Sequence, residues 1–241
     1  MFLLKTTREN LVQLLPEGGV GVEIGVAEGN FAEVLLTRAG RLHLIDPWEH
    51  QVDPAYLADP SNVDQAEADH RYATARTRFA SASEAGRVVI HRAYSDDVAQ
   101  DFPDQSLDWV YIDGAHHFEA CLADLRNYLL KIKPDGLILG HDYASHSAAK
   151  SMGFDVVEAV NQFVRDGAVE MIVLTYEPYP TYVLARTPLA GRAQTFLASA
   201  LYHFEIAMEI RNPEAKRLSQ TMITLSAGTE EVGSKLLMII E

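Results

Sequence analysis

The chain has 241 residues, of which 48% are apolar and 22% are charged, as in an ordinary soluble globular protein. Acidic residues outnumber basic ones 34 to 20, and the formal net charge of −14 leaves no basic surface for a nucleic-acid backbone. The apolar runs are strand-sized, which excludes a membrane span, and the N-terminus turns polar too early for a secretory signal. A single cysteine, Cys121, excludes a disulfide framework and a CxxC zinc site. We therefore expect a cytoplasmic protein that binds neither nucleic acid nor membranes.

The negative charge is concentrated in two stretches without lysine or arginine. Residues 46–69 contain seven acids and residues 96–124 contain eight, which together account for the charge of the whole chain. Such stretches are either solvated surface or the negative field of a site for a cationic small molecule. The composition leaves both interpretations open.

Apolar runs and helical periodicities predict the following elements in chain order. A short helix at 7–15 precedes a buried strand at 20–26, which passes through glycines into a helix that starts at Asn30. Strands follow at 42–45, 88–91, 107–112 and 137–139, with helices at 62–80 and 117–131. After a helix at 154–164, strands at 171–175 and 182–185 are joined tightly enough to be antiparallel.

Strands that alternate with helices predict an α/β fold, in which a mostly parallel sheet has helices on both faces. Residues 187–241 lack this alternation and predict a C-terminal helical extension, with a helix at 193–210 whose apolar residues share one face. This helix either packs on the core of its own domain, caps the site, or forms a contact in a homo-oligomer. The chain is thus divided into a domain at 1–186 and an extension at 187–241.

The first two strands end in residues that suit a nucleotide-like ligand. Glu23, Gly25 and Gly29 follow the first strand, but their spacing matches neither the GxGxxG fingerprint nor a P-loop. An acid such as Glu23 suits an ammonium group, while the glycines also suit a plain turn into a helix. Asp46 ends the second strand, where nucleotide-binding α/β folds place an acid that accepts hydrogen bonds from ribose hydroxyls.

Two later strands deliver histidines and aspartates to the same edge of the sheet. The fourth strand ends at Asp113, followed by His116 and His117, and the fifth ends at His141 and Asp142. A histidine can act as a general base near neutral pH, although one of the adjacent pair can simply cap the next helix. Asp113, Asp142 and His141 could also share a divalent cation, since carboxylates suit Mg²⁺ or Mn²⁺ and imidazole suits Mn²⁺ or Fe²⁺ better than Mg²⁺. The alternative is that His141 and Asp142 only hydrogen-bond substrate.

Taken together, these segments resemble the class I S-adenosylmethionine-dependent methyltransferases. The likeness is to bacterial small-molecule O-methyltransferases of an IDGxH…GHDY type, similar to macrolide-sugar enzymes, and here the motifs are 112–116 and 140–143. It covers roughly residues 15–186. It implies a Rossmann-like seven-stranded sheet of order 3-2-1-4-5-7-6 with the seventh strand antiparallel, in agreement with the terminal strand pair.

The resemblance also implies roles for individual residues. The residues that would bind the methionine end, the ribose and the adenine of S-adenosylmethionine are Glu23, Gly25, Ala27, Gly29, Asp46, Trp48, Tyr94 and Ser95. Asp113 would lie beside the sulfonium and the acceptor. Enzymes of the family that use a metal place an acid after the fourth strand and an acidic or amide pair after the fifth. Asp113 and Asp142 match this pattern and His141 departs from it, so a metal-free route with His116 or His117 as base stays open beside a Mg²⁺ or Mn²⁺ route.

We therefore expect O-methylation of a small hydroxylated molecule, a sugar or a natural-product scaffold, with Asp113, His116, His117 and His141 as catalytic candidates. A nicotinamide-dependent (NAD(P)) oxidoreductase is a rival interpretation, against which the missing GxGxxG counts. A non-catalytic cofactor-binding or assembly subunit is a second rival, against which the number of polar groups at the strand ends counts.

Overall fold

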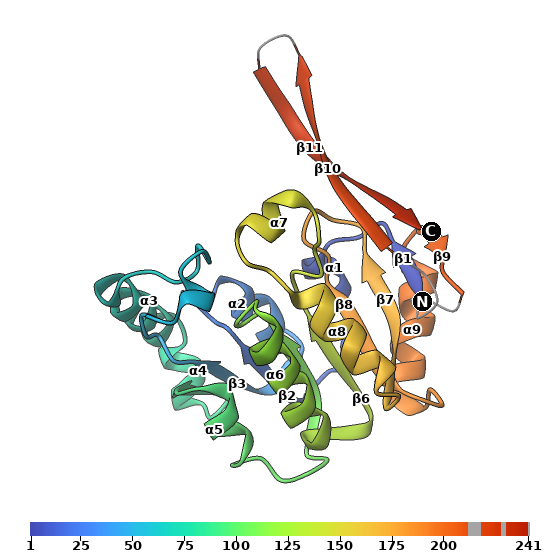
Figure 1. Cartoon of the computed structure of the whole chain (residues 1–241). Helices are drawn as coiled ribbons and strands as arrows, with labels where there is room; N and C mark the ends of the chain where they lie inside the picture. Colours follow the sequence, from blue (N-terminus) through green and yellow to red (C-terminus); the bar gives the residue numbers. More distant parts are fainter. Residues whose placement is uncertain (212–217, 228–229, 241) are drawn as a thin grey trace.

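The computed structural model describes residues 1–211, 218–227 and 230–240. Among them, nine strands form the main sheet, shown with its covering helices in Figure 1. In order across the sheet they are β4 (Val88–Arg92), β3 (Ala39–Asp46), β2 (Gly19–Ile24), β5 (Leu107–Ile112), β6 (Ile132–Gly140), β8 (Tyr182–Arg186), β7 (Val169–Thr175), β1 (Phe2–Leu4) and β9 (Ile206–Glu209). β2, β3, β4, β5 and β6 are parallel, so their carboxyl ends meet at one edge.

Helices cover both faces of the sheet, as the alternation of elements predicts. In chain order they are α1 (Arg8–Val12), α2 (Asn30–Leu36), the 3₁₀ turn η1 (Pro54–Tyr56), α3 (Gln65–Arg78), α4 (Ala80–Glu84), α5 (Ser95–Ala99), α6 (Phe118–Lys131), α7 (Ser147–Ser151), α8 (Val156–Arg165) and α9 (Gly191–His203). Apolar residues of α5, α6 and α8 pack on one face, and those of α1, α2 and α9 on the other. In the central strand β5, Val110 and Ile112 face the first group and Trp109 and Tyr111 the second, because successive side chains of a strand alternate.

The sheet has nine strands and not the predicted seven, so the order across the whole sheet differs from the predicted one, although the seven strands from β4 to β7 keep the predicted order. β1 pairs in parallel with β7, and β9 pairs antiparallel with β1, so two further strands extend the sheet. A three-residue apolar run at the N-terminus is too short to predict a strand, and its partner β9 is about 200 residues away in the chain. β8 is antiparallel to both of its neighbours, as predicted.

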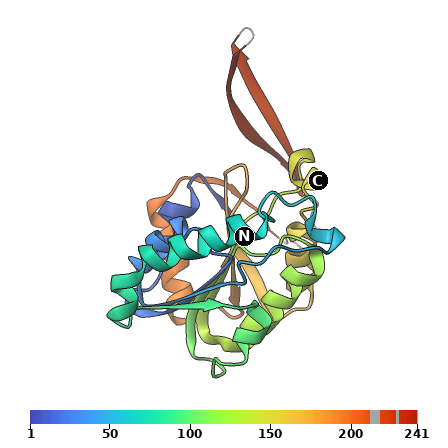
Figure 2. The same ribbon diagram turned by 90° about the vertical axis from the view of Figure 1, so that its left-hand side faces the viewer.

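The prediction of a helical C-terminal extension is also wrong. The helix predicted at 193–210 ends at His203 in α9, and residues 206–209 leave it to pair with the free edge of β1. Buried Ala193, Phe196 and Ala200 pack α9 on the domain's own core, which was one of the alternatives for this helix. Further on, β10 (Leu218–Ala227) and β11 (Glu230–Ile240) form an antiparallel ribbon that projects away from the body in both views (Figures 1 and 2).

The base of this ribbon is attached next to the strand ends that carry the predicted site. Gln220, only 7% exposed, accepts a hydrogen bond from the Ser145 backbone N–H at 2.6 Å and donates one to the Tyr143 carbonyl at 2.9 Å. Met238 is buried in the core cluster of α6 and α8. The ribbon is therefore anchored at one end to the segment that follows β6. Within the residues that the structure describes, no helix is long and apolar enough to cross a bilayer.

Candidate functional site

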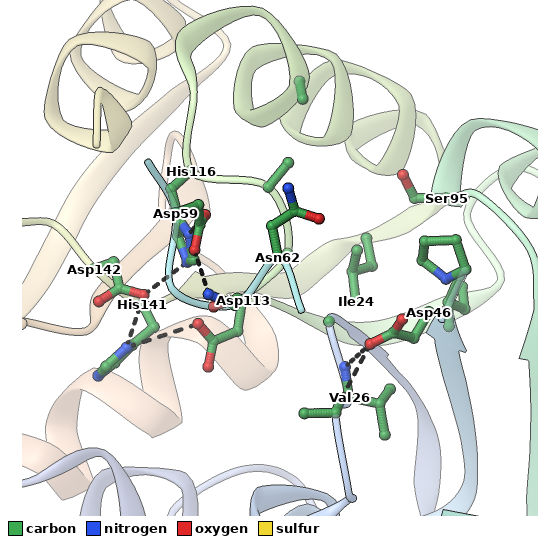
Figure 3. A pocket seen from close by; sticks show the side chains of 18 of the residues that line it. Ile24, Val26, Asp46, Asp59, Asn62, Ser95, Asp113, His116, His141 and Asp142 are labelled. Carbon is green, nitrogen blue, oxygen red and sulfur yellow. Dashed lines mark hydrogen bonds and ion pairs between the residues drawn. The ribbon is translucent and has the colours of Figure 1, made fainter. Parts of the chain in front are cut away.

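A cavity of about 740 Å³ lies at the carboxyl ends of the parallel strands (Figure 3). The ends of β2, β3, β5 and β6 supply its walls together with the start of α5, and residues of segment 47–64 also line it. The predicted site residues that line the cavity are Glu23, Gly25, Ala27, Asp46, Trp48, Tyr94, Ser95, Asp113, His116, His141 and Asp142. Gly29 and His117 are not among the lining residues.

The glycines after β2 serve the packing of the turn. Gly25 has a φ of +84°, and a Cβ at this position would collide with the carbonyl oxygen of Asp113 at the end of β5. Gly29 has a φ of +80° and is the N-cap residue of α2, where a Cβ would meet the ring of Phe79. Gly25 therefore brings the turn against the β5 end, and Gly29 starts helix α2, whose first residues Asn30 and Phe31 line the cavity.

Asp46 joins the end of β3 to this turn. Its Oδ2 accepts hydrogen bonds from the backbone N–H groups of Val26 at 2.9 Å and Ala27 at 3.0 Å, and its Oδ1 accepts one from Trp48 at 2.7 Å. Trp48 in turn donates its indole N–H to the Ala27 carbonyl at 2.9 Å. Burial raises the pKa of Asp46, and the three backbone donors oppose this rise. A carboxylate has about four acceptor positions, so Asp46 retains one for a ligand hydroxyl.

Backbone strain in this protein gathers around the cavity. The described residues include four non-glycine positions with positive φ, and three of them, Ala27 at +49°, Trp48 at +44° and Asp142 at +58°, line the cavity. Such conformations cost of order 1–3 kcal/mol each and persist only where the surrounding structure enforces them. Their concentration here indicates that the shape of the cavity is enforced by its surroundings.

Glu23 lines the cavity and has one buried carboxylate oxygen without a hydrogen-bond partner in the described part of the chain. The side chain is 1% exposed, and its Oε2 has no hydrogen-bond partner among the described residues. Burial, and to a lesser extent the negative charge of the nearby Asp113, raises the pKa of Glu23 well above its ordinary value. Buried polar atoms are nearly always paired in native structures, so Oε2 is suited to a donor or cation brought by a ligand.

A chain of alternating carboxylates and imidazoles forms one end of the cavity. His116 Nδ1 lies 2.6 Å from Asp59, and its Nε2 lies 3.0 Å from Asp142 Oδ2. The same Asp142 oxygen lies 3.3 Å from His141 Nδ1, which is also 3.7 Å from Asp113. Burial alone would lower the pKa of His116, but Asp142 and Asp59 outweigh it and raise that pKa to about 10. His116 therefore lies between two carboxylates that favour its protonated form.

His117 has a different position from its neighbour. Its Nδ1 accepts a hydrogen bond from the Ala120 backbone N–H at 3.4 Å, as the N-cap of α6, and its ring meets that of Tyr56 edge-on at 4.5 Å. The structure thus places His116 at the cavity and His117 at the helix start. This is the division of roles that the sequence left open for the adjacent pair.

Two charged residues of the site carried no sequence signal of their own. Arg8, at the start of α1, places its guanidinium 2.8 Å from Asp113 and over the ring of Phe31 at 4.4 Å. Asp59 lies within segment 47–64, in the acidic stretch at 46–69 that contains no lysine or arginine. The sequence indicated this stretch as a whole but did not single out Asp59. Arg8 is 105 residues from its partner, so no local pattern could connect them.

Asp113, His141 and Asp142 also meet the first requirement of a metal site. One ligand atom from each lies within 4.8 Å of the others. Asp142 is engaged by both imidazoles and Asp113 by Arg8, so a bound cation would have to replace some of these contacts. The donor set of two carboxylates and one imidazole suits Mn²⁺ or Fe²⁺ better than Mg²⁺.

Comparisons with known proteins place this geometry in a family. The sequence model of a family described as a methyltransferase domain matches residues 22–143, more than half of the chain. That match spans the turn after β2, Asp46, Asp113 and the His141–Asp142 pair. No curated protein sequence matches the chain significantly.

Solved structures share the fold at low sequence identity. SMU.1697c of Streptococcus mutans, solved in complex with SAH, has a TM-score of 0.50 and 11% identity, and the match covers 74% of this chain and 94% of that one. N-methyltransferase NodS of Bradyrhizobium japonicum has a TM-score of 0.52 and 13% identity, with coverages of 73% and 92%. A protein of Clostridium thermocellum described as an rRNA methylase has a TM-score of 0.53 and 15% identity, with coverages of 76% and 94%.

These structures are described as different kinds of methyltransferase and are at most 15% identical to this chain, so their likeness extends to the Rossmann-like fold alone. The family match covers most of the residues that line the cavity, with the strained turn and the polar strand ends, in one continuous segment. The chain therefore belongs to this methyltransferase family and is a class I S-adenosylmethionine-dependent methyltransferase.

Proposed function

We propose that this protein transfers a methyl group from S-adenosylmethionine to an oxygen atom of a small hydroxylated molecule, such as a sugar or a natural-product scaffold. The observation that carries the proposal is the His141–Asp142 pair beside Asp113 at one end of the cavity. A hydroxyl must lose its proton to become a good nucleophile, and an imidazole oriented by a carboxylate is suited to accept it.

The cavity fits the cofactor. The unpaired Oε2 of Glu23 suits the ammonium group of the methionine part, and the remaining acceptor position of Asp46 suits a ribose hydroxyl. A volume of about 740 Å³ lies within the range of sites that enclose a molecule of this size. When bound, S-adenosylmethionine supplies an electrophilic methyl group on a positively charged sulfur.

Among the three histidines, we assign the role of general base to His141. Both ring nitrogens of His116 face carboxylates, and His117 caps α6 outside the cavity. His141 Nδ1 faces Asp142, which favours the tautomer with the proton on Nδ1 and the lone pair on Nε2. Within the described chain nothing hydrogen-bonds Nε2, and His141 lines the cavity. Asp113 keeps the place that the resemblance implies, beside the sulfonium and the acceptor.

A divalent cation held by Asp113, His141 and Asp142 is the second route to the same reaction. A cation there would lower the pKa of the acceptor hydroxyl directly, and His141 would then be a ligand instead of a base. The two routes are separated by a chelator. Activity that is unchanged by EDTA supports the His141 route, whereas activity lost with EDTA and restored by Mn²⁺ or Mg²⁺ supports the cation route.

The test of the proposed function has a binding part and a transfer part. In the binding part, calorimetric titration with S-adenosylmethionine, S-adenosylhomocysteine and NADH separates a methyltransferase from the oxidoreductase rival. Trp48 lines the cavity and the other tryptophan, Trp109, is fully buried, so tryptophan fluorescence gives an independent signal of binding.

In the transfer part, a panel of hydroxylated sugars and natural products is incubated with the cofactor and analysed by mass spectrometry for the gain of one methyl group on oxygen. Cofactor binding without any transfer would support the non-catalytic rival. Transfer to RNA or to nitrogen in place of a hydroxyl group would contradict the proposal. The net charge of −14 makes us expect no transfer to RNA.

A further inference from the structure

One buried carboxyl group in the cavity is used by none of the roles described above. Asp124 is on α6, is 4% exposed and lines the cavity. Its Oδ1 accepts a hydrogen bond from the hydroxyl of Ser95, the first residue of α5. No described group hydrogen-bonds its Oδ2. Asp124 therefore brings one free acceptor oxygen to the cavity wall.

The position of this oxygen along the cavity relates it to the base of the cofactor. Figure 3 shows Ser95, the partner of Asp124, on the same side of the cavity as Asp46, with Asp113 and His141 on the other side. If Asp46 binds the ribose hydroxyls and Asp113 lies beside the sulfur, the purine extends past Asp46 toward the start of α5. Ser95 and Asp124 are at that end.

The face of α6 that meets the cavity suits a flat ring with one polar edge. Ala120, Ala123 and Asp124 all line the cavity, and residues spaced by three and four positions share one face of a helix. The two alanines leave a shallow apolar surface on which a purine can lie. The carboxylate of Asp124 lies at the edge of this apolar surface.

Neighbouring contacts hold Asp124 in this orientation. Tyr128, one turn further along α6, donates its hydroxyl to the Ser95 carbonyl at 3.1 Å, and Asn127 donates its side-chain amide to Asp96 at 2.8 Å. These bonds fix the start of α5 against α6. Burial, opposed by the Ser95 hydrogen bond and assisted by Asp96, raises the pKa of Asp124 to about 7. Burial destabilises the ionised form of this carboxyl group, and a hydrogen bond from an additional donor would stabilise it.

We propose that Asp124 is a specificity-determining residue that accepts a hydrogen bond from the 6-amino group of the cofactor's adenine and so selects an adenine base. This inference rests on the assignment of the cavity to S-adenosylmethionine. It does not depend on the acceptor or on the atom that is methylated. The Ser95 hydroxyl, which donates to the other oxygen, holds the carboxylate in place.

The test compares two ligands on the full-length protein. One is S-adenosylhomocysteine and the other is its analogue in which hydrogen replaces the 6-amino group of the purine. A hydrogen bond to a buried charged acceptor contributes roughly 10-fold to 100-fold in affinity, so the native protein should prefer S-adenosylhomocysteine by about that factor. In Asp124→Ala the preference should fall to about one, through weaker binding of S-adenosylhomocysteine only.

Two further variants complete the series. In Asp124→Asn the acceptor is uncharged and the shape is kept, so the preference should fall to an intermediate value. This variant carries the test if Asp124→Ala does not fold. Asp97→Ala removes a neighbouring, exposed carboxylate of α5 that does not line the cavity, and it should leave the preference unchanged.

The outcomes distinguish this inference from the assignment of the cavity. An unchanged preference in both Asp124 variants, with S-adenosylhomocysteine still bound by the native protein, overturns the role of Asp124 alone. No binding of either ligand by the native protein overturns the assignment of the cavity itself. Equal binding of both ligands by the native protein shows that the 6-amino group is not recognised, and it also overturns the inference.

Discussion

The carboxylate of Asp59 lies 2.6 Å from Nδ1 of His116, a residue 57 positions further along the chain. This contact joins segment 47–64 to the segment that follows β5. Both residues line the cavity, and each is nearly buried. Asp59 thus closes a series of contacts that continues through Asp142 to His141, the proposed base.

The first prediction concerns this contact. Asp59→Ala removes the contact that holds segment 47–64 to His116. The rate of methyl transfer should therefore fall by about 10-fold to 100-fold, which corresponds to the free energy of one hydrogen bond to a charged group. Hydrogen exchange of the amides in 47–64 should accelerate, while that of β5 stays slow. Asp59→Asn, which can still accept the bond from Nδ1, should recover part of both effects. If exchange and transfer in Asp59→Ala match the native protein, Asp59 has no positioning role.

The second prediction separates the histidines. His141→Gln should reduce methyl transfer by about 10²-fold to 10⁴-fold, the usual contribution of a general base, with little change in the affinity for S-adenosylhomocysteine. His117→Asn is the matched control, since asparagine is also a good N-cap residue and His117 does not line the cavity. Methyl transfer and cofactor affinity are measured for both variants. Comparable losses of activity in the two variants would contradict the assignment of the base to His141.

The third prediction concerns stability and pH. His43 Nδ1 lies 3.0 Å from His91 Nε2 across β3 and β4, and neither residue lines the cavity. Burial and the neighbouring His91 lower the pKa of His43 to about 4, and burial lowers that of His91. Both rings have an ordinary pKa of about 6.5 when unfolded, so the unfolded chain binds more protons at mildly acidic pH.

The stabilisation that depends on His43 and His91 being neutral should therefore be fully present above about pH 6.5 and be lost as the pH drops toward 4. Urea unfolding of the native protein and of His43→Gln between pH 7.5 and 5 isolates this contribution, because the other titrating groups, such as His116 with its raised pKa, are common to both proteins. The midpoint of the native protein, relative to that of His43→Gln, should fall as the pH falls. The same comparison with the variant in which glutamine replaces the exposed His70 on α3 should show no dependence on pH. A difference between the native protein and His43→Gln that is the same at pH 7.5 and at pH 5 would contradict the prediction.

The fourth prediction concerns the ribbon of β10 and β11. A two-stranded ribbon that projects from the body is marginally stable by itself, so its amides should exchange much faster than those of the central strand β5. Exchange should be slowest at the base, where Gln220 joins the segment after β6. The measurement is native-state hydrogen exchange followed by mass spectrometry. Strong protection along the whole ribbon would contradict this prediction. If light scattering also gave twice the monomer mass, a second copy of the chain would cover the ribbon, as in a homo-oligomer formed through the C-terminal residues.

The parallel core and its polar strand ends were accessible from the sequence because they depend on short-range patterns. The run at 107–112 is β5, residue for residue, since a strand buried on both faces is apolar at nearly every position. Carboxyl ends of neighbouring parallel strands meet at one edge, so Asp46, Asp113 and His141 could be placed together before any contact was known. The two stretches without lysine or arginine, at 46–69 and 96–124, account for the charge of −14. They contain four aspartates that all line the cavity: Asp46, Asp59, Asp113 and Asp124.

Tertiary structure decided the contacts between residues that are far apart in the chain. Arg8 meets Asp113 and Asp59 meets His116 because a helix start and a long connection reach the same strand ends, and no local periodicity encodes such meetings. The strands β1 and β9 were missed for a similar reason: each is short, and each is stabilised by the edge that the other elements leave free. A strand's apolar pattern is set by its own residues, whereas its existence at a sheet edge depends on hydrogen-bond partners supplied from elsewhere in the fold.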